Sequence, residues 1–493
     1  MTSRIRLRYS GLTVFSSRLF QILTGLLFTI AVTRNLTPYE FGIWQNIGDL
    51  QGYFTILAAA LPGWQIRYLA RGQKEAGKTG VVLNLVLSIP FAAAFLALSP
   101  LFAKTFTTSA VYYALASIQV VELFLIPAAE GLSHATRPHV IGYVQFLREI
   151  VKILFGVLLI VVLKLGILGA IFAVAVTYAF DIIFILYIFQ DLLRERLRLE
   201  LVKDWAKGSL FSLYGIFGGK LASLDTLLLI LIVGVEARAL YGAAFIIGAL
   251  ITYANSLSIG LYPRLLAGGG RQDVETALKT TYLFAVPMAA GTIVYAESFL
   301  TILNPAYSSA RLVLILFSIN SLLTCFSVIL DSVIYALEGV DREGGFTLRE
   351  LLRSSFFVLP TVGYVLSGAY LTILYFLFSS VKSFLAGAQT LIIVCNVFAV
   401  VGVAVRYWIS RKRLQFKIPS VLLKYALSAL IMSSILYFLP SPTRIITTFL
   451  SVIFGAVIYF VVLAAIDYET RATIHLVLRE LHVRAVSRDK LKL

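Results

Sequence analysis

Two stretches of sequence decide the fold, "FLREIVKILFGVLL" (146–159) and "TLRELLRSSFFVLP" (347–360). Each places three charges at one spacing at the head of an apolar run. The charges are Arg148, Glu149 and Lys152 in the first stretch, and Arg349, Glu350 and Arg353 in the second. Subtracting 148 from 349 gives 201, and the other two pairs give the same offset. A charge pattern repeated in so hydrophobic a chain predicts a duplicated structure.

The composition predicts a membrane protein. The 493 residues are 59% hydrophobic and only 14% charged, whereas a soluble domain carries about a quarter charged residues. Apolar runs of about 20 residues, each long enough to cross a hydrocarbon core about 30 Å thick, recur along the chain. We therefore expect an all-α polytopic membrane protein with about 14 transmembrane helices. The spans lie near 10–33, 40–61, 80–102, 109–132, 140–163, 167–190, 209–233, 239–261, 278–300, 311–337, 348–372, 380–405, 420–439 and 445–466. The break between the eleventh and twelfth spans is open, because "SSVK" (379–382) competes with "YVLSGAY" (364–370).

The net charge of +17 comes from Lys and Arg residues that cluster in every second loop. The intervening loops hold at most Arg34, Lys104, Lys164, Arg238, Arg311, Lys382 and Arg444. Cytoplasmic loops carry the excess of basic residues in membrane proteins, so both termini are predicted to be cytoplasmic in a multi-pass protein of the cell (inner) membrane. Juxtamembrane cations bind anionic lipid headgroups. Membrane lipids are therefore the expected partners of these bases, and nucleic acid is not.

The repeat extends beyond the two opening stretches. The matched segments are "VFSSRL" (14–19) with "IFGGKL" (216–221), "YEFG" (39–42) with "ALYG" (239–242), and Glu130 with Asp331. An even number of crossings separates the partners, so two six-helix lobes of the same orientation are implied. Parallel repeats of this kind occur in transporters, with the substrate site between them. The predicted domains are residues 1–200, 201–410 and 411–493, the last holding two additional helices and a basic tail.

The repeated charges lie at a depth where they need partners. Lys152 is 12 residues from Lys164, about 18 Å along a helix, which places it about 12 Å inside a core about 30 Å thick. An unpaired charge there costs on the order of 3 kcal/mol or more. Glu130, on the preceding span, is a plausible partner. Two interpretations stay open for these charges, an inter-helix clamp and a gate or substrate contact. The full set is Glu130, Arg148, Glu149, Lys152, Asp331, Arg349, Glu350 and Arg353.

Two further cations are candidates for substrate binding. Arg18 and Lys220 occupy matched positions in the first and seventh spans, beside small residues and without an acid on the same helix face. We expect them to line a cavity that attracts an anionic group; the alternative is that they snorkel to the headgroups. Buried carboxylates can carry H⁺ or bind Na⁺, and the alternative for each is pairing with Arg18, Lys220 or a backbone donor on another helix. The candidates for ion coupling are Asp49, Glu122, Asp181 and Asp225. No metal site and no cofactor are predicted.

Three segments carry a resemblance to a known family. "VTRNLTPYEFGIW" (32–44), "LYPRL" (261–265) and "PMAAGTIVYAESFLTILNPAYSSARLVL" (287–314) resemble polysaccharide or O-antigen (Wzx-type) flippases of the multidrug/oligosaccharidyl-lipid/polysaccharide exporter superfamily. The chain departs from the family at Thr37, where Gly is common, a change we interpret as neutral in a turn. The resemblance implies two six-helix lobes that open alternately to each side. It also implies that Arg18 resembles a cation with which related lipid II flippases engage a diphosphate.

These features together predict a flippase that moves polyprenyl-phosphate- or pyrophosphate-linked oligosaccharide to the outer leaflet by alternating access, and not an enzyme. Its partners would be this lipid-linked glycan and glycan-assembly enzymes, and we expect a monomer. A multidrug and toxin extrusion antiporter is the first alternative, although a cavity for cationic drugs should favour acids over bases. A membrane glycosyltransferase or glycan polymerase is the second. Such enzymes usually place catalytic carboxylates in a large outer loop, and the predicted one here holds only Glu297.

Overall fold

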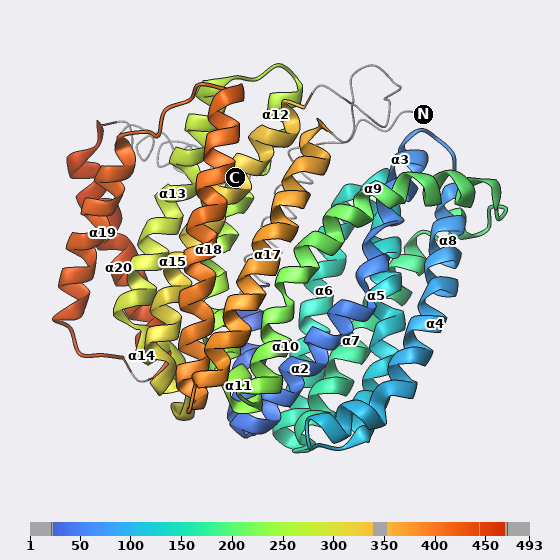
Figure 1. Cartoon of the computed structure of the whole chain (residues 1–493), viewed down its shortest axis with the longest axis horizontal. Helices are drawn as coiled ribbons and strands as arrows, with labels where there is room; N and C mark the ends of the chain where they lie inside the picture. Colours follow the sequence, from blue (N-terminus) through green and yellow to red (C-terminus); the bar gives the residue numbers. More distant parts are fainter. Residues whose placement is uncertain (1–20, 22, 339–352, 443, 469–470, 472–493) are drawn as a thin grey trace, which may run out of the picture. The chain divides into compact units, whose positions relative to one another are not determined.

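The computed structural model describes residues 21, 23–338, 353–442, 444–468 and 471, and Figure 1 shows their arrangement. Every regular element in this part of the chain is a helix. Ten of these helices are long and apolar enough to cross a membrane, and an eleventh, Val421–Tyr437, is apolar but shorter. The protein is therefore an all-helical polytopic membrane protein, as predicted. The count of fourteen spans remains a prediction, since Arg18 and the rest of the first predicted span up to residue 20 lie outside the described residues.

The chain divides into two compact units. Unit 1 comprises residues 1–242 and 356–391, and unit 2 comprises 243–355 and 392–493. Helix α11 (Val235–Ala249) begins in unit 1 and ends in unit 2, as does α18 (Phe384–Arg413). The other helices of unit 1 are α2 (Pro38–Phe54), η1 (Ile56–Ala59), α3 (Pro62–Ala70), α4 (Glu75–Thr105), α5 (Ala110–Thr136), α6 (Pro138–Gly156), η2 (Val157–Val162), α7 (Gly166–Ile188), α8 (Gln190–Leu193), α9 (Glu200–Ala222), α10 (Leu224–Ile232) and α17 (Ser355–Ser380). These units follow contacts in space, and the three domains expected from the repeat stay a prediction.

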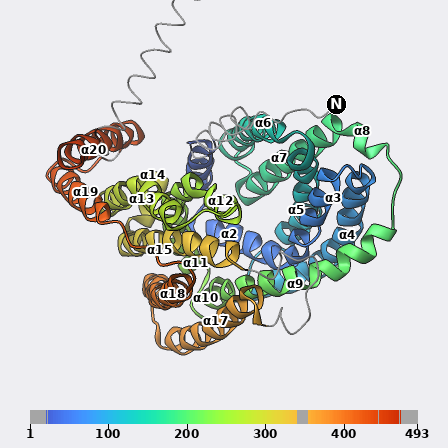
Figure 2. The same cartoon turned by 90° about the horizontal axis from the view of Figure 1, so that it is seen from above.

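Helix α5 is central to the packing of unit 1. It contacts α4 on one side and α7 on the other, and α6 packs against α7, as Figure 2 shows from above. The start of α9 joins this bundle through Trp205, which is completely buried and meets Tyr68 edge-on at a centroid distance of 5.9 Å. Helix α5 therefore lies between α4 and α7 at the centre of unit 1.

Helix α2 begins with a well-formed cap. The Thr37 hydroxyl accepts a hydrogen bond from the Glu40 amide at 3.2 Å, and the Glu40 carboxylate accepts one from the Thr37 amide at 2.8 Å. Pro38 occupies the first helical turn, where its missing N–H costs nothing. Reciprocal bonds of this kind satisfy two otherwise unpaired amides at a helix start. Thr37 is thus a capping residue of α2, and since Thr and Gly are about equally favourable at this position, its predicted neutrality relative to Gly stays a prediction.

The glycines that end two matched segments lie where α2 meets α11. A Cβ atom on Gly42 would lie 2.4 Å from the carbonyl oxygen of Val235, and one on Gly242 would lie 3.2 Å from Cδ of Gln45. Real Cβ atoms do not tolerate the shorter approach, so the two backbones require glycine at position 42 to come this close. "YEFG" and "ALYG", matched in the sequence repeat, therefore contribute to one helix contact.

Unit 2 is built around α13 (Arg271–Val294) and α15 (Arg311–Ala336). Its other elements are η3 (Leu250–Ser258), α12 (Leu261–Leu266), α14 (Ala296–Leu303), η4 (Pro305–Ala310), α19 (Val421–Tyr437) and α20 (Ile445–Ile466). Helices α19 and α20 pack on each other, and α19 lies against α13 (Figures 1 and 2). The two helices beyond the repeat are thus attached to unit 2 through α13.

Polar pairs bridge α15 and α18 within unit 2. The Asn320 amide donates to the Asn396 oxygen at 3.1 Å, and Nε of Arg406 donates to Asp331 at 2.8 Å. At the end of α18, Arg413 pairs at 3.0 Å with Glu338, which follows the end of α15. The repeat predicted a clamp between Asp331 and the charges of 349–353; the structure adds Arg406 as a partner of Asp331, while 349–352 lie outside the described residues.

Two expected boundaries are settled by the structure. Helix α17 runs without a break through "YVLSGAY" (364–370), and the chain leaves helix at 381–383. The break is therefore at "SSVK". The ninth span, expected near 278–300, is α13, which begins earlier at Arg271 and ends at Val294; the short helix α14 then starts at Ala296. Tyr295 leaves the helical conformation between them and donates its hydroxyl to the Leu436 carbonyl at 3.3 Å.

Candidate functional site

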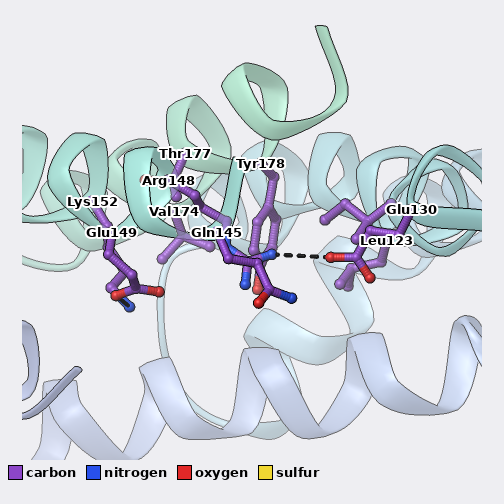
Figure 3. A pocket seen from close by; sticks show the side chains of 10 residues that line it. Leu123, Glu130, Gln145, Arg148, Glu149, Lys152, Val174, Thr177 and Tyr178 are labelled. Atoms are coloured by element: carbon purple, nitrogen blue, oxygen red, sulfur yellow. Dashed lines mark hydrogen bonds and ion pairs between the residues drawn. The ribbon is translucent and has the colours of Figure 1, made fainter. Parts of the chain in front are cut away.

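The charges of the first opening stretch line a cavity in unit 1. This cavity, of about 460 Å³, lies among α5, α6 and α7, and its side chains are drawn in Figure 3. The lining residues are Leu123, Ile126, Glu130, Gln145, Arg148, Glu149, Lys152, Val174, Thr177 and Tyr178. Three of them were singled out by their repeated spacing, and Glu130 by its place on the preceding span. Sequence and structure thus point to the same polar layer inside an apolar bundle.

Arg148, on α6, connects this helix to α5 and α7 at the cavity. Its Nη1 lies 3.0 Å from Asp181 Oδ2 on α7 and 3.5 Å from Glu130 Oε1 on α5. The Asp181 side chain is only 1% exposed; its Oδ2 pairs with the guanidinium, while its Oδ1 accepts no hydrogen bond within the described residues. Buried charges persist only when they are paired and hydrogen-bonded. The Glu130–Arg148 contact follows the expected arrangement, and Asp181, expected as an ion-coupling residue, joins it.

Lys152 has a different partner from the one expected. Its Nζ pairs with Oε2 of Glu149, one turn earlier on α6, and not with Glu130. The same carboxylate oxygen accepts a 2.7 Å hydrogen bond from the Thr24 hydroxyl, on the helical segment 23–35. Spacing i,i+3 brings two side chains to the same face, which makes Glu149 the nearer acid. Glu149 therefore connects the first helical segment to α6 as well.

A second charged contact joins α2 to α11. Nε of Arg238 lies 2.7 Å from Asp49 Oδ2, and Nη2 lies 2.9 Å from Oδ1, so the guanidinium grips the carboxylate with two parallel bonds. Gln45 accepts a further bond from Nη2 at 3.2 Å. The Arg238 side chain is 6% exposed and that of Asp49 is 20% exposed. Paired forks of this kind are among the strongest hydrogen-bonded contacts in proteins.

This contact corrects two expectations. Arg238 was counted among the loop cations, but α11 starts at Val235 and includes it. Asp49 was expected to be free for ion coupling or paired with Arg18 or Lys220, and its partner in the structure is Arg238. The sequence held a usable signal, because Arg238 precedes Gly242 by one helical turn and Gly242 ends the repeated segment. Nothing in the repeat pointed to Arg406, the partner of Asp331.

Lys220 and Asp225 lie on either side of a helix break at Ser223, between α9 and α10. The Tyr370 hydroxyl of α17 donates to Asp225 Oδ2 at 2.7 Å, so Asp225 also has a donor. Within the described residues Lys220 forms no ion pair, and its Nζ lies against α2, 3.1 Å from where a Cβ on Gly52 would be. Lys220 is a half-buried cation directed toward protein. Its role in substrate binding, rather than in snorkelling to the headgroups, stays a prediction.

The remaining candidates are placed as follows. Glu122, on α5, is 8% exposed, and in the described part of the chain its Oε2 accepts no hydrogen bond. Arg353 is exposed, while Arg18, Arg349 and Glu350 lie outside the described residues. Among the residues that are described, no three His, Cys, Asp or Glu side chains form a group suited to a metal ion. The structure thus brings Glu130, Arg148, Glu149, Lys152 and Asp181 together, and places Asp49 and Asp225 outside this group.

Solved structures with the same fold are found by comparison over nearly the whole chain. The lipid II flippase MurJ, in an inward closed conformation, matches 92% of this chain and 99% of its own, with a TM-score of 0.68 and 12% identity. A multidrug resistance MATE family transporter of the MOP superfamily, inward-facing, matches 82% and 98%, with a TM-score of 0.58 and 15% identity. A MOP superfamily transporter from Pyrococcus furiosus, described as having a binding pocket of reverse polarity, matches 82% and 95%, with a TM-score of 0.50 and 17% identity.

These likenesses define the class of fold. The chain has the fold of the MOP superfamily, the multidrug/oligosaccharidyl-lipid/polysaccharide exporters. At identities of 12–17% they show the fold alone. No protein-family model matches the chain, and no curated protein does.

Proposed function

We propose that this protein is a flippase for polyprenyl-linked oligosaccharide, of the Wzx type, in the cell membrane. The observation that carries the proposal is the match to the lipid II flippase MurJ, which extends over 92% of this chain, whereas the MATE transporter match covers 82%. Fourteen spans, twelve of them in two parallel six-helix lobes and two additional, complete the proposal, together with cytoplasmic termini and a monomeric state. No covalent chemistry is needed, because the reaction is a change of leaflet.

The phosphate group of the cargo would bind to cations that have no carboxylate of their own. Lys220 fits this role among the described residues, since it forms no ion pair and is directed toward α2. Arg18, its partner in the repeat, is proposed for the same role from sequence. A cation held away from bulk water attracts a phosphate more strongly than one in solution. The lipid tail would stay in the bilayer while the headgroup crosses inside the protein.

Alternating access would require α2 and α11 to part on the predicted outer side. The Asp49–Arg238 pair and the close contact at Gly42 hold them together in this structure. A ligand changes such an equilibrium only by binding one state better than the other. Glu122 is the proposed coupling residue, because its buried Oε2 lacks a donor in the described part of the chain and is therefore suited to take up H⁺.

A specific observation favours a second candidate, an antiporter for cationic drugs. Two cations, Arg148 and Lys152, meet three carboxylates in and behind the cavity, Glu130, Glu149 and Asp181. A formal excess of one negative charge is what a cationic substrate would prefer. This antiporter predicts that cells overproducing the protein survive higher concentrations of ethidium or a quaternary ammonium drug. The flippase proposal predicts no change in these inhibitory concentrations.

The deciding experiment uses the full chain in proteoliposomes. A polyprenyl-diphosphate disaccharide, placed in both leaflets, is probed with a membrane-impermeant reagent that modifies sugars. Liposomes with the protein should expose the inner-leaflet pool over minutes, and empty liposomes should keep about half protected. A pool that stays protected, with H⁺ and Na⁺ gradients tested in either direction, would refute the proposal.

A further inference from the structure

We propose that the cavity among α5, α6 and α7 is a sugar subsite that accepts a neutral or amino sugar and excludes both the phosphate group and acidic sugars. This inference rests on the proposed flippase function and specifies which part of the cargo the cavity takes. Its evidence is the identity, pairing and position of the side chains in Figure 3.

The pairing of the charges argues against a phosphate in the cavity. Arg148 is already shared between Asp181 and Glu130, and Lys152 is held by Glu149. A phosphate reaching either cation would have to displace a carboxylate and would then lie beside it. Like charges brought together in a desolvated site disfavour binding strongly. Lys220, which forms no ion pair among the described residues, offers the phosphate a site without this competition.

The polar groups that remain suit hydroxyl groups. Gln145 lies between Glu130 and the Glu149–Lys152 pair in Figure 3. Its Oε1 is shielded from solvent and accepts no hydrogen bond in the part of the chain that the structure describes. A buried acceptor without a donor is costly to leave so. Because Gln145 lines the cavity, a turn of its side chain would bring this oxygen to a ligand hydroxyl. Carboxylates on either side accept from hydroxyls as well, while the Tyr178 ring adds an apolar wall.

The size and the formal charge fix the class of ligand. A volume of about 460 Å³ falls within the range of about 300–1,000 Å³ usual for small-molecule sites. The lining itself holds two cations and two carboxylates, and the buried Asp181 behind Arg148 adds a third carboxylate, so the group has an excess of one formal negative charge. A hexuronic acid would add a second carboxylate to this excess, whereas a protonated amino sugar would lower it. The subsite therefore discriminates sugars by charge, with the diphosphate bound elsewhere.

The test compares three polyprenyl-diphosphate disaccharides that differ only in the second sugar: N-acetylglucosamine, glucosamine or glucuronic acid. In proteoliposomes with the wild-type chain, the first two should cross at least about tenfold faster than the third. Glu130→Gln removes one carboxylate and should narrow this ratio severalfold. Glu200→Gln, which alters a carboxylate that is 82% exposed, should leave the ratio unchanged.

A second variant guards against a simple loss of folding. Gln145→Leu breaks no ion pair, so the protein should reach the membrane in normal amount. The transport rates of the N-acetylglucosamine and glucosamine lipids should fall. Equal wild-type rates for all three disaccharides would overturn the subsite and leave the flippase proposal standing. An unchanged ratio in Glu130→Gln would do the same. Failure of every lipid to cross would overturn the flippase proposal, and the subsite with it.

Discussion

The contact between Asp49 and Arg238 gives the most exact prediction for stability. Breaking a buried ion pair by removing one partner costs about 3–5 kcal/mol, because the other charge stays buried. Asp49→Asn leaves a guanidinium that is 6% exposed and cannot lose its proton. Arg238→Gln leaves a carboxylate that is 20% exposed and can be neutralised by a proton. We therefore expect Asp49→Asn to cost about 4–5 kcal/mol and Arg238→Gln about 3 kcal/mol.

The double variant separates pairing from the two individual losses. Asn and Gln side chains can hydrogen-bond each other, so no charge is left unpaired when both substitutions are made. The double variant should be more stable than the sum of the two losses predicts by about 2 kcal/mol. The measurement is the free energy of unfolding in mixed detergent micelles, followed by tryptophan fluorescence. Glu200→Gln, at an exposed pair, should change it by less than about 1 kcal/mol.

Additive losses would contradict this reasoning. If the coupling energy falls below about 0.5 kcal/mol, the two residues contribute independently. The bidentate contact would then not hold α2 against α11, and its proposed role in closing the outer side would lose its support.

Three further predictions concern single residues. Lys220→Ala should abolish transport of the polyprenyl-diphosphate disaccharide at unchanged membrane abundance, whereas Lys220→Arg should retain it; loss of abundance would make this cation structural. Gly42→Ala should lower the free energy of unfolding by about 1–3 kcal/mol because its Cβ would meet Val235. Gly48→Ala, whose Cβ has open space around it, should not lower this free energy. Equal effects of the two substitutions would contradict the close contact at Gly42. Thr37→Ala should cost about 1 kcal/mol through loss of the α2 cap, measured in the same unfolding assay, and no change would mean that the cap is not formed.

The sequence predicted the helices well because span length and apolar composition are local properties. Helix α17, for example, follows from a continuous apolar run, and the polar "SSVK" marks its end. The pairing of Glu149 with Lys152 was also within reach, since i,i+3 spacing alone brings them together. These features depend on neighbours within one or two helical turns.

The partners of Asp49 and Asp331 depend on tertiary packing, and the sequence pattern did not identify either of them. Arg238 lies 189 residues after Asp49, and a helix start four residues later than the true one placed it in a loop. Asp331 matches Glu130 in the repeat, yet it binds Arg406, which has no counterpart in the repeat pattern. Repeats preserve the helix arrangement more strictly than they preserve the pairing of each charge, because any nearby cation can satisfy a buried acid.

The central claim is that a lipid-linked sugar passes through the polar cavity of unit 1. A photoreactive benzophenone amino acid at position 145 places a crosslinker between the two charged ends of that cavity. After irradiation of living cells, mass spectrometry of the purified protein should find a polyprenyl-linked glycan attached at this position. Crosslinks to phospholipid acyl chains alone, with no glycan-bearing lipid, would contradict the claim.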